Sequence, residues 1–242
     1  MEPLYKDDLA YIQAAAFGEI AQGAAPEIVR RLNTAAIPIR RVVDVGCGAG
    51  PLTAALVRAG FEATGIDNSA ELLEIARAAV PQARFIHASV YDVEIPPCEA
   101  IVAFGEPLTY HAADAESLVK GFFERASDVL PPGGMLIFDL IELGKPSLAA
   151  RFWSSGDNWA VLVDTTEGQN SRTLVRNIET FRRVDQFYRR GREVHTVRLF
   201  DTAAVCNQLA TCGFTVETAQ AYGAQRLSPR RRAFFCTRIR KA

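Results

Sequence analysis

The sequence predicts an α/β protein with a Rossmann-like, doubly wound sheet of seven mostly parallel strands and an antiparallel β insertion after the fifth strand. Three observations support this fold. A β-rich apolar run, Val42–Val45, ends in alternating glycines where a helix-forming stretch begins. Strand and helix patterns then alternate along the chain, which is typical of a parallel sheet covered on both faces. The 242 residues, 49% hydrophobic and 23% charged, suffice for one domain over residues 1–242 with an insertion.

The N-terminal part is expected to hold a helical cap and the first strands of the sheet. The cap is expected to cover residues 1–35. Within it, the helical periodicity of residues 8–32 is interrupted by Gly18, Gly23 and Pro26. This interruption favours two short helices over one long helix. The core then begins at residue 41, with strands expected at 41–46, 61–66 and 84–87 and helices at 52–59 and 70–79.

The rest of the core is expected to surround the insertion. The core comprises residues 41–140 and 201–242, and the insertion, residues 145–200, is expected to act as a lid. Strands are predicted at 100–105 and 135–140 and a helix at 116–129 between them. Partial alternation in the insertion predicts three antiparallel strands, at 159–167, 173–183 and 187–199. An Asp201-Thr202 cap begins a helix that Gly213 ends, and strands at 214–218 and 233–239 close the sheet.

The turn after the first strand is the strongest functional signal. Its glycines are Gly46, Gly48 and Gly50. Residues without Cβ accept positive-φ geometry and let the backbone approach a ligand closely. Asp44 places a carboxylate beside this loop, and Asn68 follows Asp67 at the end of the second strand. An acidic residue at that position typically accepts hydrogen bonds from both hydroxyls of a ribose, so Asp67 is the expected adenosine anchor.

With these motifs the chain resembles the class I S-adenosylmethionine-dependent methyltransferases, whose first motif is a D/E-x-G-x-G-x-G turn and whose second strand ends in an acidic residue. The resemblance covers most of the chain, including the turns at 85–92 and 130–134 and the C-terminal strand pair. It implies S-adenosyl-L-methionine as the cofactor and S-adenosyl-L-homocysteine as the product. The cofactor-binding residues that it implies are Asp44, Gly46, Gly48, Gly50, Asp67, Asn68, Ser89, Val90 and Gly105.

The turn after the third strand departs from the family pattern. The family commonly has an acidic residue there that bonds the adenine amino group, whereas this chain has Ala88 and Ser89. Ser89 is able to accept the same bond more weakly. The alternative is that Asp92 takes this role through a shifted turn.

The loop after the fourth strand holds the first acceptor-side candidates, Glu106, Tyr110 and His111. Methyl transfer depends mainly on in-line alignment and on exclusion of water, and an amine or hydroxyl acceptor benefits from a base. Glu106 is expected to hold a cationic acceptor or the ammonium of the cofactor, and Tyr110 to orient an acceptor lone pair. The alternative is a loop whose polar groups only cap the next helix.

His195 is the third catalytic candidate. It lies three residues from Arg198 on a predicted strand, and this odd separation places the two side chains on opposite faces, so that only one can face the pocket. A lone strand histidine is more often packed or on the surface than a base. Arg176 presents the same ambiguity.

Aromatic and arginine side chains have simpler expected roles. Trp153, Trp159, Tyr11 and Phe17 are expected in the core rather than around an acceptor. Two arginine-rich stretches are expected to be solvated turns: Arg182, Arg183, Arg189, Arg190 and Arg192, and Arg226, Arg230, Arg231 and Arg232. An RNA-contacting patch is the alternative, but no aromatic residues interleave the second stretch and the net charge is only −1. Nucleic acid and anionic membranes are therefore disfavoured partners.

Cysteine usage and the absence of targeting patterns favour a cytoplasmic location. The five cysteines form no C-x-x-C pair, so reduced thiols are expected and no metal site is indicated. The start of the sequence lacks the features of a signal peptide, and no apolar run reaches about 20 residues. Formation of a homodimer through the insertion is compatible with the sequence but not required by it.

The sequence as a whole predicts a methyltransferase that uses S-adenosylmethionine and acts on a nitrogen or oxygen of a small molecule. The alternatives are an RNA or protein methyltransferase and a non-catalytic S-adenosylmethionine-binding module. The first is disfavoured because Gly105-Glu106-Pro107-Leu108 is not the Asn/Asp-Pro-Pro-Tyr motif that accompanies methylation of exocyclic or amide nitrogens. The intact glycine turn argues against the second, and its spacing makes a dehydrogenase a weaker alternative.

Overall fold

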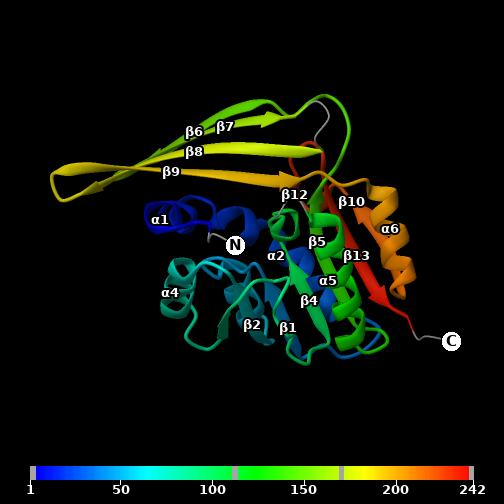
Figure 1. Ribbon diagram of the computed structural model, residues 1–242. Coiled ribbons are helices and arrows are strands. Elements are labelled where there is room, and N and C mark those ends of the chain that lie inside the picture. Colours follow the sequence, from blue (N-terminus) through cyan, green and yellow to red (C-terminus); the bar gives the residue numbers. More distant parts are fainter. Residues whose placement is uncertain (1–3, 111–113, 169–171, 240–242) are drawn as a thin grey trace.

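A seven-stranded sheet forms the centre of the computed structural model, which describes residues 4–110, 114–168 and 172–239. Its strands are β1 (Arg41–Val45), β2 (Glu62–Asp67), β3 (Arg84–His87), β4 (Ala100–Ala103), β5 (Met135–Ile141), β10 (Phe214–Ala219) and β13 (Arg231–Arg238). The spatial order is β10-β13-β5-β4-β1-β2-β3, with β1 to β5 parallel to one another and β13 antiparallel to both of its neighbours, β5 and β10 (Figure 1). The predicted fold class is confirmed.

Helices cover both faces of this sheet, because consecutive residues of its central strands are apolar and point to opposite faces. On one face lie α2 (Gly18–Asn33) and α3 (Pro51–Arg58), packed against Val42 and its neighbours on the same face. On the other face lie α5 (Ala115–Val129) and α6 (Thr202–Thr211), packed against Val43 and its neighbours. The central strands are therefore buried on both sides, as a parallel sheet requires.

The helix ends follow the predicted signals in most places. Asp201 accepts a hydrogen bond from the amide of Ala204 at the start of α6, and Gly213 has a φ of +83° just after its end. The N-terminal cap differs in one respect. It forms two helices, α1 (Asp7–Ala16) and α2, but Gly23 and Pro26 lie inside α2 instead of ending it. The apolar face that α2 buries against the sheet outweighs the unfavourable local propensity of these two residues.

The insertion forms a separate antiparallel sheet of four strands rather than the predicted three. These are β6 (Ala150–Gly156), β7 (Trp159–Glu167), β8 (Thr173–Val184) and β9 (Phe187–Arg198), in that order. The sequence does not reveal β6 because its residues are mostly exposed and lack an apolar alternation. Three short elements were also not predicted: the 3-10 helix Pro107–Thr109, β11 (Ala221–Tyr222) and β12 (Gln225–Arg226).

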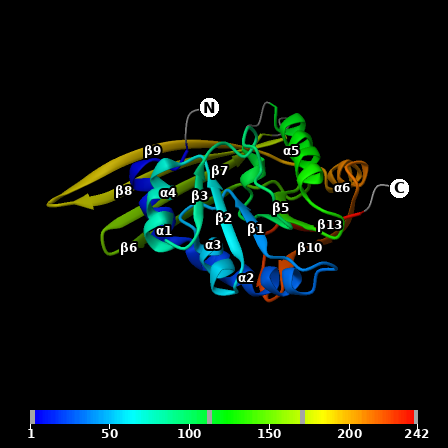
Figure 2. The same cartoon turned by 90° about the horizontal axis from the view of Figure 1, so that it is seen from below.

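The four-stranded sheet extends across the top of the molecule, and α1 lies beneath it (Figures 1 and 2). Leu9 and Ile12 of α1 pack against Val161 of β7 and Ile178 of β8. Tyr11, Phe17 and Trp159 are packed around this cluster, as predicted. The core prediction is wrong for Trp153, which is 72% exposed because it stands opposite Leu162 on the outer face of the sheet.

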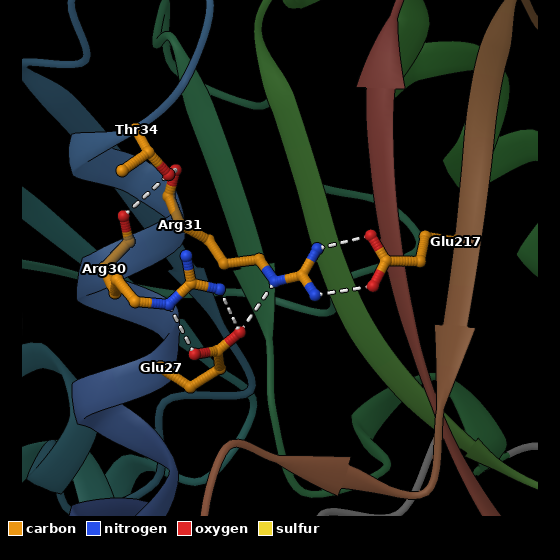
Figure 3. A network of polar contacts seen from close by, with 5 residues as sticks. All are labelled: Glu27, Arg30, Arg31, Thr34 and Glu217. Atoms are coloured by element: carbon orange, nitrogen blue, oxygen red, sulfur yellow. Dashed lines mark hydrogen bonds and ion pairs between the residues drawn. The ribbon is translucent and has the colours of Figure 1, made fainter.

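A network of ion pairs fixes α2 to the edge strand β10 (Figure 3). Arg31 donates hydrogen bonds of 2.7 and 2.6 Å to the two carboxylate oxygens of Glu217, and its guanidinium carbon lies 3.7 Å from the ring centroid of Phe235. Glu27 accepts hydrogen bonds from both Arg30 and Arg31.

No helix among the described residues is long and apolar enough to cross a membrane.

We expect Glu27→Gln to lower the free energy of unfolding by about 1–2 kcal/mol at pH 7, since hydrogen bonds to charged groups are lost. The hydrogen bond from Arg30, supported by Arg31, lowers the pKa of Glu27 from 4.5 to about 2. A carboxyl with a lowered pKa stabilises the fold above its unfolded pKa, and this stabilisation is lost as the pH falls from 4.5 towards 2. Urea unfolding at several pH values measures the effect, with Glu74→Gln at an exposed position of α4 (Ala70–Ala79) as the control. Identical pH profiles for both variants would contradict it.

Candidate active site

A cavity of about 680 Å³ lies at the carboxyl ends of the central parallel strands. The loops after β1, β2, β3 and β4 line it, which is where ligands bind in open α/β sheets. Other parts of the chain complete its wall: Tyr5 before α1, Arg176 on β8 and Arg231 on β13. The cavity is thus built from both ends of the chain and from the insertion as well as from the core strands.

The glycine loop is shaped by two different requirements. Gly46 has a φ of +68°, and a Cβ built on it would lie 2.3 Å from the Cβ of Pro107. Gly48 has a φ of +55°, but a Cβ there would meet nothing closer than the Leu72 side chain at 4.0 Å. Gly46 therefore permits contact between two loops of the protein, while Gly48 exposes backbone to the cavity. Gly50, with a φ of +81°, precedes Pro51 at the start of α3.

The two predicted acidic residues lie at the ends of neighbouring strands. Asp67 accepts hydrogen bonds from the amides of Gly48, at 2.8 Å, and Ser69, at 2.9 Å, one on each carboxylate oxygen. Each oxygen keeps a second lone pair for a ligand. Asp44 is 2% exposed and accepts a 2.6 Å hydrogen bond from Thr53 Oγ1. Burial raises the pKa of Asp67 and raises the pKa of Asp44 to about 7.

The turn after β3 contains Ser89 and Asp92, the two candidates for the adenine contact, in different surroundings. Ala88, Ser89 and Val90 line the cavity, and Ser89 Oγ accepts a hydrogen bond of 3.2 Å from the amide of Tyr91. Asp92 is exposed and is not among the lining residues. Ser89 therefore lines the cavity whereas Asp92 does not, and Asn68 and Gly105, which are also predicted to bind the cofactor, are among the lining residues.

Glu106 lines the cavity in an unusual backbone conformation. Its φ is +61°, which is unfavourable for a residue with a Cβ, and it is 9% exposed. Oε1 accepts a 2.8 Å hydrogen bond from Arg176 Nη2, whereas Oε2 has no hydrogen-bond partner among the described residues. A strained, buried carboxylate with an open oxygen in a cavity is typical of a functional site.

Tyr110 forms a pair with Tyr5, a residue that the sequence did not single out. The two hydroxyl oxygens are 2.8 Å apart, and both residues line the cavity. Burial raises the pKa of both phenols, so they stay protonated at neutral pH and act as hydrogen-bond donors or acceptors instead of bases. His111, the neighbouring candidate, lies outside the described residues.

His195 is fully buried behind the two tyrosines. Its ring centroid is 4.8 Å from that of Tyr5 and 5.9 Å from that of Tyr110, both edge-on, and its Nε2 is 2.8 Å from Glu193 Oε2. It is not among the described cavity-lining residues, and neither is Arg198, whose Nη2 donates a 2.7 Å hydrogen bond to Glu116. His195 is therefore placed to position the tyrosines rather than to touch a ligand.

The N-terminal segment is fastened over the cavity by polar contacts. The amides of Tyr5 and Lys6 donate hydrogen bonds of 2.8 and 2.9 Å to the carboxylate of Glu193 on β9. Ser69 Oγ donates a 2.9 Å hydrogen bond to the carbonyl oxygen of Tyr5. Asp8, which is 4% exposed, accepts hydrogen bonds from Arg182 and Arg189. The core, the insertion and α1 are thus connected around one site.

Arg231 and Asp139 form a second ion pair that the sequence analysis missed. Arg231 Nε donates a short hydrogen bond to one carboxylate oxygen of Asp139, and the other oxygen accepts a 2.8 Å hydrogen bond from the amide of Gly105. Asp139 is fully buried, and Arg231 Nη2 has no hydrogen-bond partner among the described residues. An acidic residue at the carboxyl end of an otherwise apolar strand is the signal that could have revealed this pair.

The prediction of solvated arginine turns is correct for the arginines that are exposed, which are Arg183, Arg189, Arg190, Arg192 and Arg226. It is wrong for Arg182, Arg230, Arg231 and Arg232, which are partly or fully buried. Six of the nine arginines form ion pairs within the protein. Arg230 binds Glu167 and is 9% exposed. The other pairs are Arg182 and Arg189 with Asp8, Arg190 with Glu179, Arg231 with Asp139, and Arg232 with Glu142. The charges of these paired arginines are neutralised locally.

No group of three or more metal-ligating side chains occurs in the part of the chain that the structure describes.

A comparison with protein families and curated proteins matches the core of the chain. A family model described as a methyltransferase domain matches residues 42–134. The protein YqeM of Bacillus subtilis (strain 168) is 26% identical over 189 residues, which are 75% of this chain and 76% of YqeM. Trans-aconitate 2-methyltransferase of Afipia carboxidovorans (strain ATCC 49405 / DSM 1227 / KCTC 32145 / OM5) is 35% identical over 113 residues, which are 46% of this chain but only 42% of that protein.

Solved structures match nearly the whole chain. An S-adenosylmethionine-dependent methyltransferase from Clostridium acetobutylicum ATCC 824 has a TM-score of 0.80 at 18% identity, over 96% of this chain and 98% of that one. The sugar N-methyltransferase KedS8 from Streptoalloteichus sp ATCC 53650 has a TM-score of 0.75 at 20% identity, over 99% and 98% of the two chains. At these identities the likeness concerns the fold, including the four-stranded sheet.

The residues around the cavity fit S-adenosylmethionine. The open space in front of Gly48 is a cradle that a Cβ would begin to fill, and the free lone pairs of Asp67 point to a ligand that donates two hydrogen bonds. A ribose has two neighbouring hydroxyls that match such a carboxylate. Ser89 and Val90 lie where a base attached to that ribose would extend along the ends of β2 and β3.

Proposed function

We propose that this chain, an S-adenosylmethionine-dependent methyltransferase with the class I fold, methylates an amine nitrogen of a small molecule. The observation that carries the proposal is the buried Glu106 Oε2, which faces no hydrogen-bond donor among the described residues. An amine supplies the missing donor. The sugar N-methyltransferase KedS8 is a fold neighbour that acts on this class of atom, which supports the proposal.

Within this proposal the protein's own residues bind, orient and desolvate the acceptor. Bound S-adenosylmethionine supplies an electrophilic methyl group on its sulfonium. Glu106 accepts a hydrogen bond from the amine and takes up the proton that the nitrogen must lose, while Arg176 keeps its carboxylate in place. The paired phenols of Tyr5 and Tyr110 orient the nitrogen lone pair. The insertion, residues 145–200, acts as the lid and excludes water, because its strand β8 supplies Arg176 to the cavity wall.

Methylation of an oxygen is the second candidate. Arg176 and Arg231 both line the cavity, and a guanidinium suits a carboxylate. Trans-aconitate 2-methyltransferase is a relative whose name indicates an acid as its substrate. Glu106, however, would repel such an acid, which is why we favour the amine.

An RNA or protein substrate is less well supported. The arginines that a nucleic acid would need are held in ion pairs with acidic residues of the chain. A non-catalytic binding module would not require the open carboxylate of Glu106 beside the cofactor loop. A cytoplasmic location and a homodimer remain predictions of the sequence.

The test combines the purified protein, S-adenosylmethionine and matched acceptors. We expect mass gain of one methyl group on primary amines such as cyclohexylamine, accompanied by release of S-adenosylhomocysteine, and no product with cyclohexanol or cyclohexanecarboxylate. The value of kcat/KM should rise with pH until the amine is deprotonated, because only the neutral nitrogen has a free lone pair. Methylation of the alcohol or the acid alone would overturn the amine proposal in favour of the oxygen candidate.

A further inference from the structure

Two buried polar atoms of the cavity wall lack a hydrogen-bond partner among the described residues. They are Glu106 Oε2 and Arg231 Nη2, an acceptor and a donor. Both residues line the cavity. Leaving a buried polar group unpaired is costly, and in native proteins such a group usually has a functional reason. The pair therefore indicates a ligand that donates at one point and accepts at another.

The sheet order places Arg231 away from the Gly48–Asp67 contact, whereas Glu106 precedes Pro107, which lies against Gly46 of the glycine loop. The strands run β13-β5-β4-β1-β2, so Arg231 and Asp139 lie on one side of β4 and the Gly48–Asp67 contact lies on the other. Arg231 Nη2 is 4.0 Å from the Cβ position of Gly105, directly after β4, and Glu106 is the next residue. The two open atoms thus belong to Glu106 and to a residue that lies against Gly105, the residue before it.

The Arg231 guanidinium is held in a fixed orientation. Asp139 receives a hydrogen bond from Arg231 Nε and another from the amide of Gly105, so it connects the arginine to the loop that carries Glu106. Glu106 is held in turn by Arg176. Together, the carboxylates of Asp139 and Glu106 and the guanidinium groups of Arg231 and Arg176 carry no net charge. Such a site suits a ligand with a donor and an acceptor close together better than an isolated ammonium or an isolated anion.

We propose, on the basis of the amine acceptor proposed above, that this acceptor carries an oxygen next to its amine, that Arg231 binds this oxygen and that Glu106 binds the nitrogen. The oxygen belongs to a hydroxyl or a carboxylate, which share the ability to accept a hydrogen bond from a guanidinium. Arg231 is then a specificity-determining residue, because an amine without the oxygen leaves its Nη2 unpaired. Asp139 is a positioning residue that acts through Arg231.

The experiment measures binding to the complex of the protein with S-adenosylhomocysteine, so that it does not depend on turnover. The probes are 2-aminocyclohexanol, 2-aminocyclohexanecarboxylate and cyclohexylamine, titrated by calorimetry. We expect at least one oxygen-bearing probe to bind about 10-fold to 100-fold more tightly than cyclohexylamine. Its identity distinguishes the hydroxyl from the carboxylate. If neither binds more tightly than cyclohexylamine, the proposal is overturned, even where amines are methylated.

Variants at Arg231 connect this preference to the guanidinium. Arg231→Leu in an Asp139→Asn background removes both charges together and should abolish the preference, whereas Arg231→Lys should retain part of it. The positioning role of Asp139 predicts that Asp139→Asn alone raises KM for the oxygen-bearing acceptor more than for cyclohexylamine. Melting temperatures and S-adenosylhomocysteine affinity serve as controls for folding. The assignment of Arg231 to the acceptor oxygen would be refuted by a folded double variant that keeps the preference for oxygen-bearing probes. It would also be refuted by an Arg231→Lys variant that binds S-adenosylhomocysteine tenfold more weakly than the wild type.

Discussion

Replacing Asp67 with alanine should weaken the binding of S-adenosylmethionine at least about 100-fold while the protein remains folded. Asp67 is expected to accept hydrogen bonds from two ribose hydroxyls through the lone pairs that Gly48 and Ser69 leave free. Each hydrogen bond to a charged group contributes about 1.5–3 kcal/mol, and 1.4 kcal/mol corresponds to a factor of ten in affinity. The measurement is calorimetric titration with S-adenosylmethionine and S-adenosylhomocysteine, with NAD as the control ligand.

Asp67→Asn is the matched control for this experiment. An asparagine side chain keeps the shape but has one acceptor oxygen instead of two, so we expect an affinity between those of the wild type and the alanine variant. Binding of NAD with an affinity similar to that of S-adenosylmethionine would revive the dehydrogenase alternative. If Asp67→Ala binds S-adenosylmethionine as tightly as the wild type, the ribose assignment is wrong.

Gly46→Ala should destabilise the protein by about 2–5 kcal/mol and abolish cofactor binding. The new Cβ would lie 2.3 Å from the Cβ of Pro107 and 2.9 Å from its Cγ, and the proline ring has little freedom to move aside. The φ of +68° adds a cost of about 1–2 kcal/mol for any residue with a Cβ, and overpacking adds about 1–3 kcal/mol. The loops after β1 and β4 would be pushed apart, which also displaces Glu106. Urea unfolding measures the destabilisation, and calorimetric titration with S-adenosylmethionine measures the loss of binding.

Gly48→Ala separates stability from ligand binding. A Cβ on Gly48 meets only the Leu72 side chain at 4.0 Å, so we expect a loss of about 1–2 kcal/mol, which reflects the φ of +55° alone. Because this Cβ points into the cavity, cofactor affinity should fall as strongly as in Gly46→Ala. Urea unfolding and calorimetry on both variants give the comparison. Equal stabilities of the two variants would show that the contact with Pro107 does not constrain the fold.

The sequence predicts the central sheet well because its signals are local. The β-rich run before Gly46, the alternating strands and helices, and the cap at Asp201 are all readable from neighbouring residues, and all three correspond to the structure. The exposed strand β6 has no such signal, and the exposed Trp153 shows that an aromatic residue on an outer sheet face resembles a core residue in sequence. Burial of α2 overrides the helix-breaking tendency of Pro26.

The candidate site also contains some residues that a local sequence pattern predicts and others that it does not. The residues of the glycine loop, Asp67 and Ser89 follow strand ends, where the sequence pattern alone predicts a binding role. Asp139 and Arg231 are far apart in the sequence and meet because β5 and β13 are neighbours in the sheet. Tyr5 is likewise far from Tyr110 in the sequence but forms a hydrogen bond with it. No local pattern reveals such contacts. His195 illustrates the converse, because its local pattern cannot distinguish a ligand-facing position from one behind two tyrosines.

This division has a consequence for how the enzyme can change during evolution. The segment 42–134 contains the glycine loop, Asp67, Ser89, Glu106 and Tyr110, whereas Tyr5, Arg176 and Arg231 lie outside it. On the assignment proposed above, replacing Tyr5, Arg176 or Arg231 should alter the recognised acceptor while the glycine loop, Asp67 and Ser89 stay unchanged. We therefore expect new acceptors to become accessible through mutations near Tyr5, in the insertion and near Arg231, and these are the segments to randomise when engineering acceptor choice.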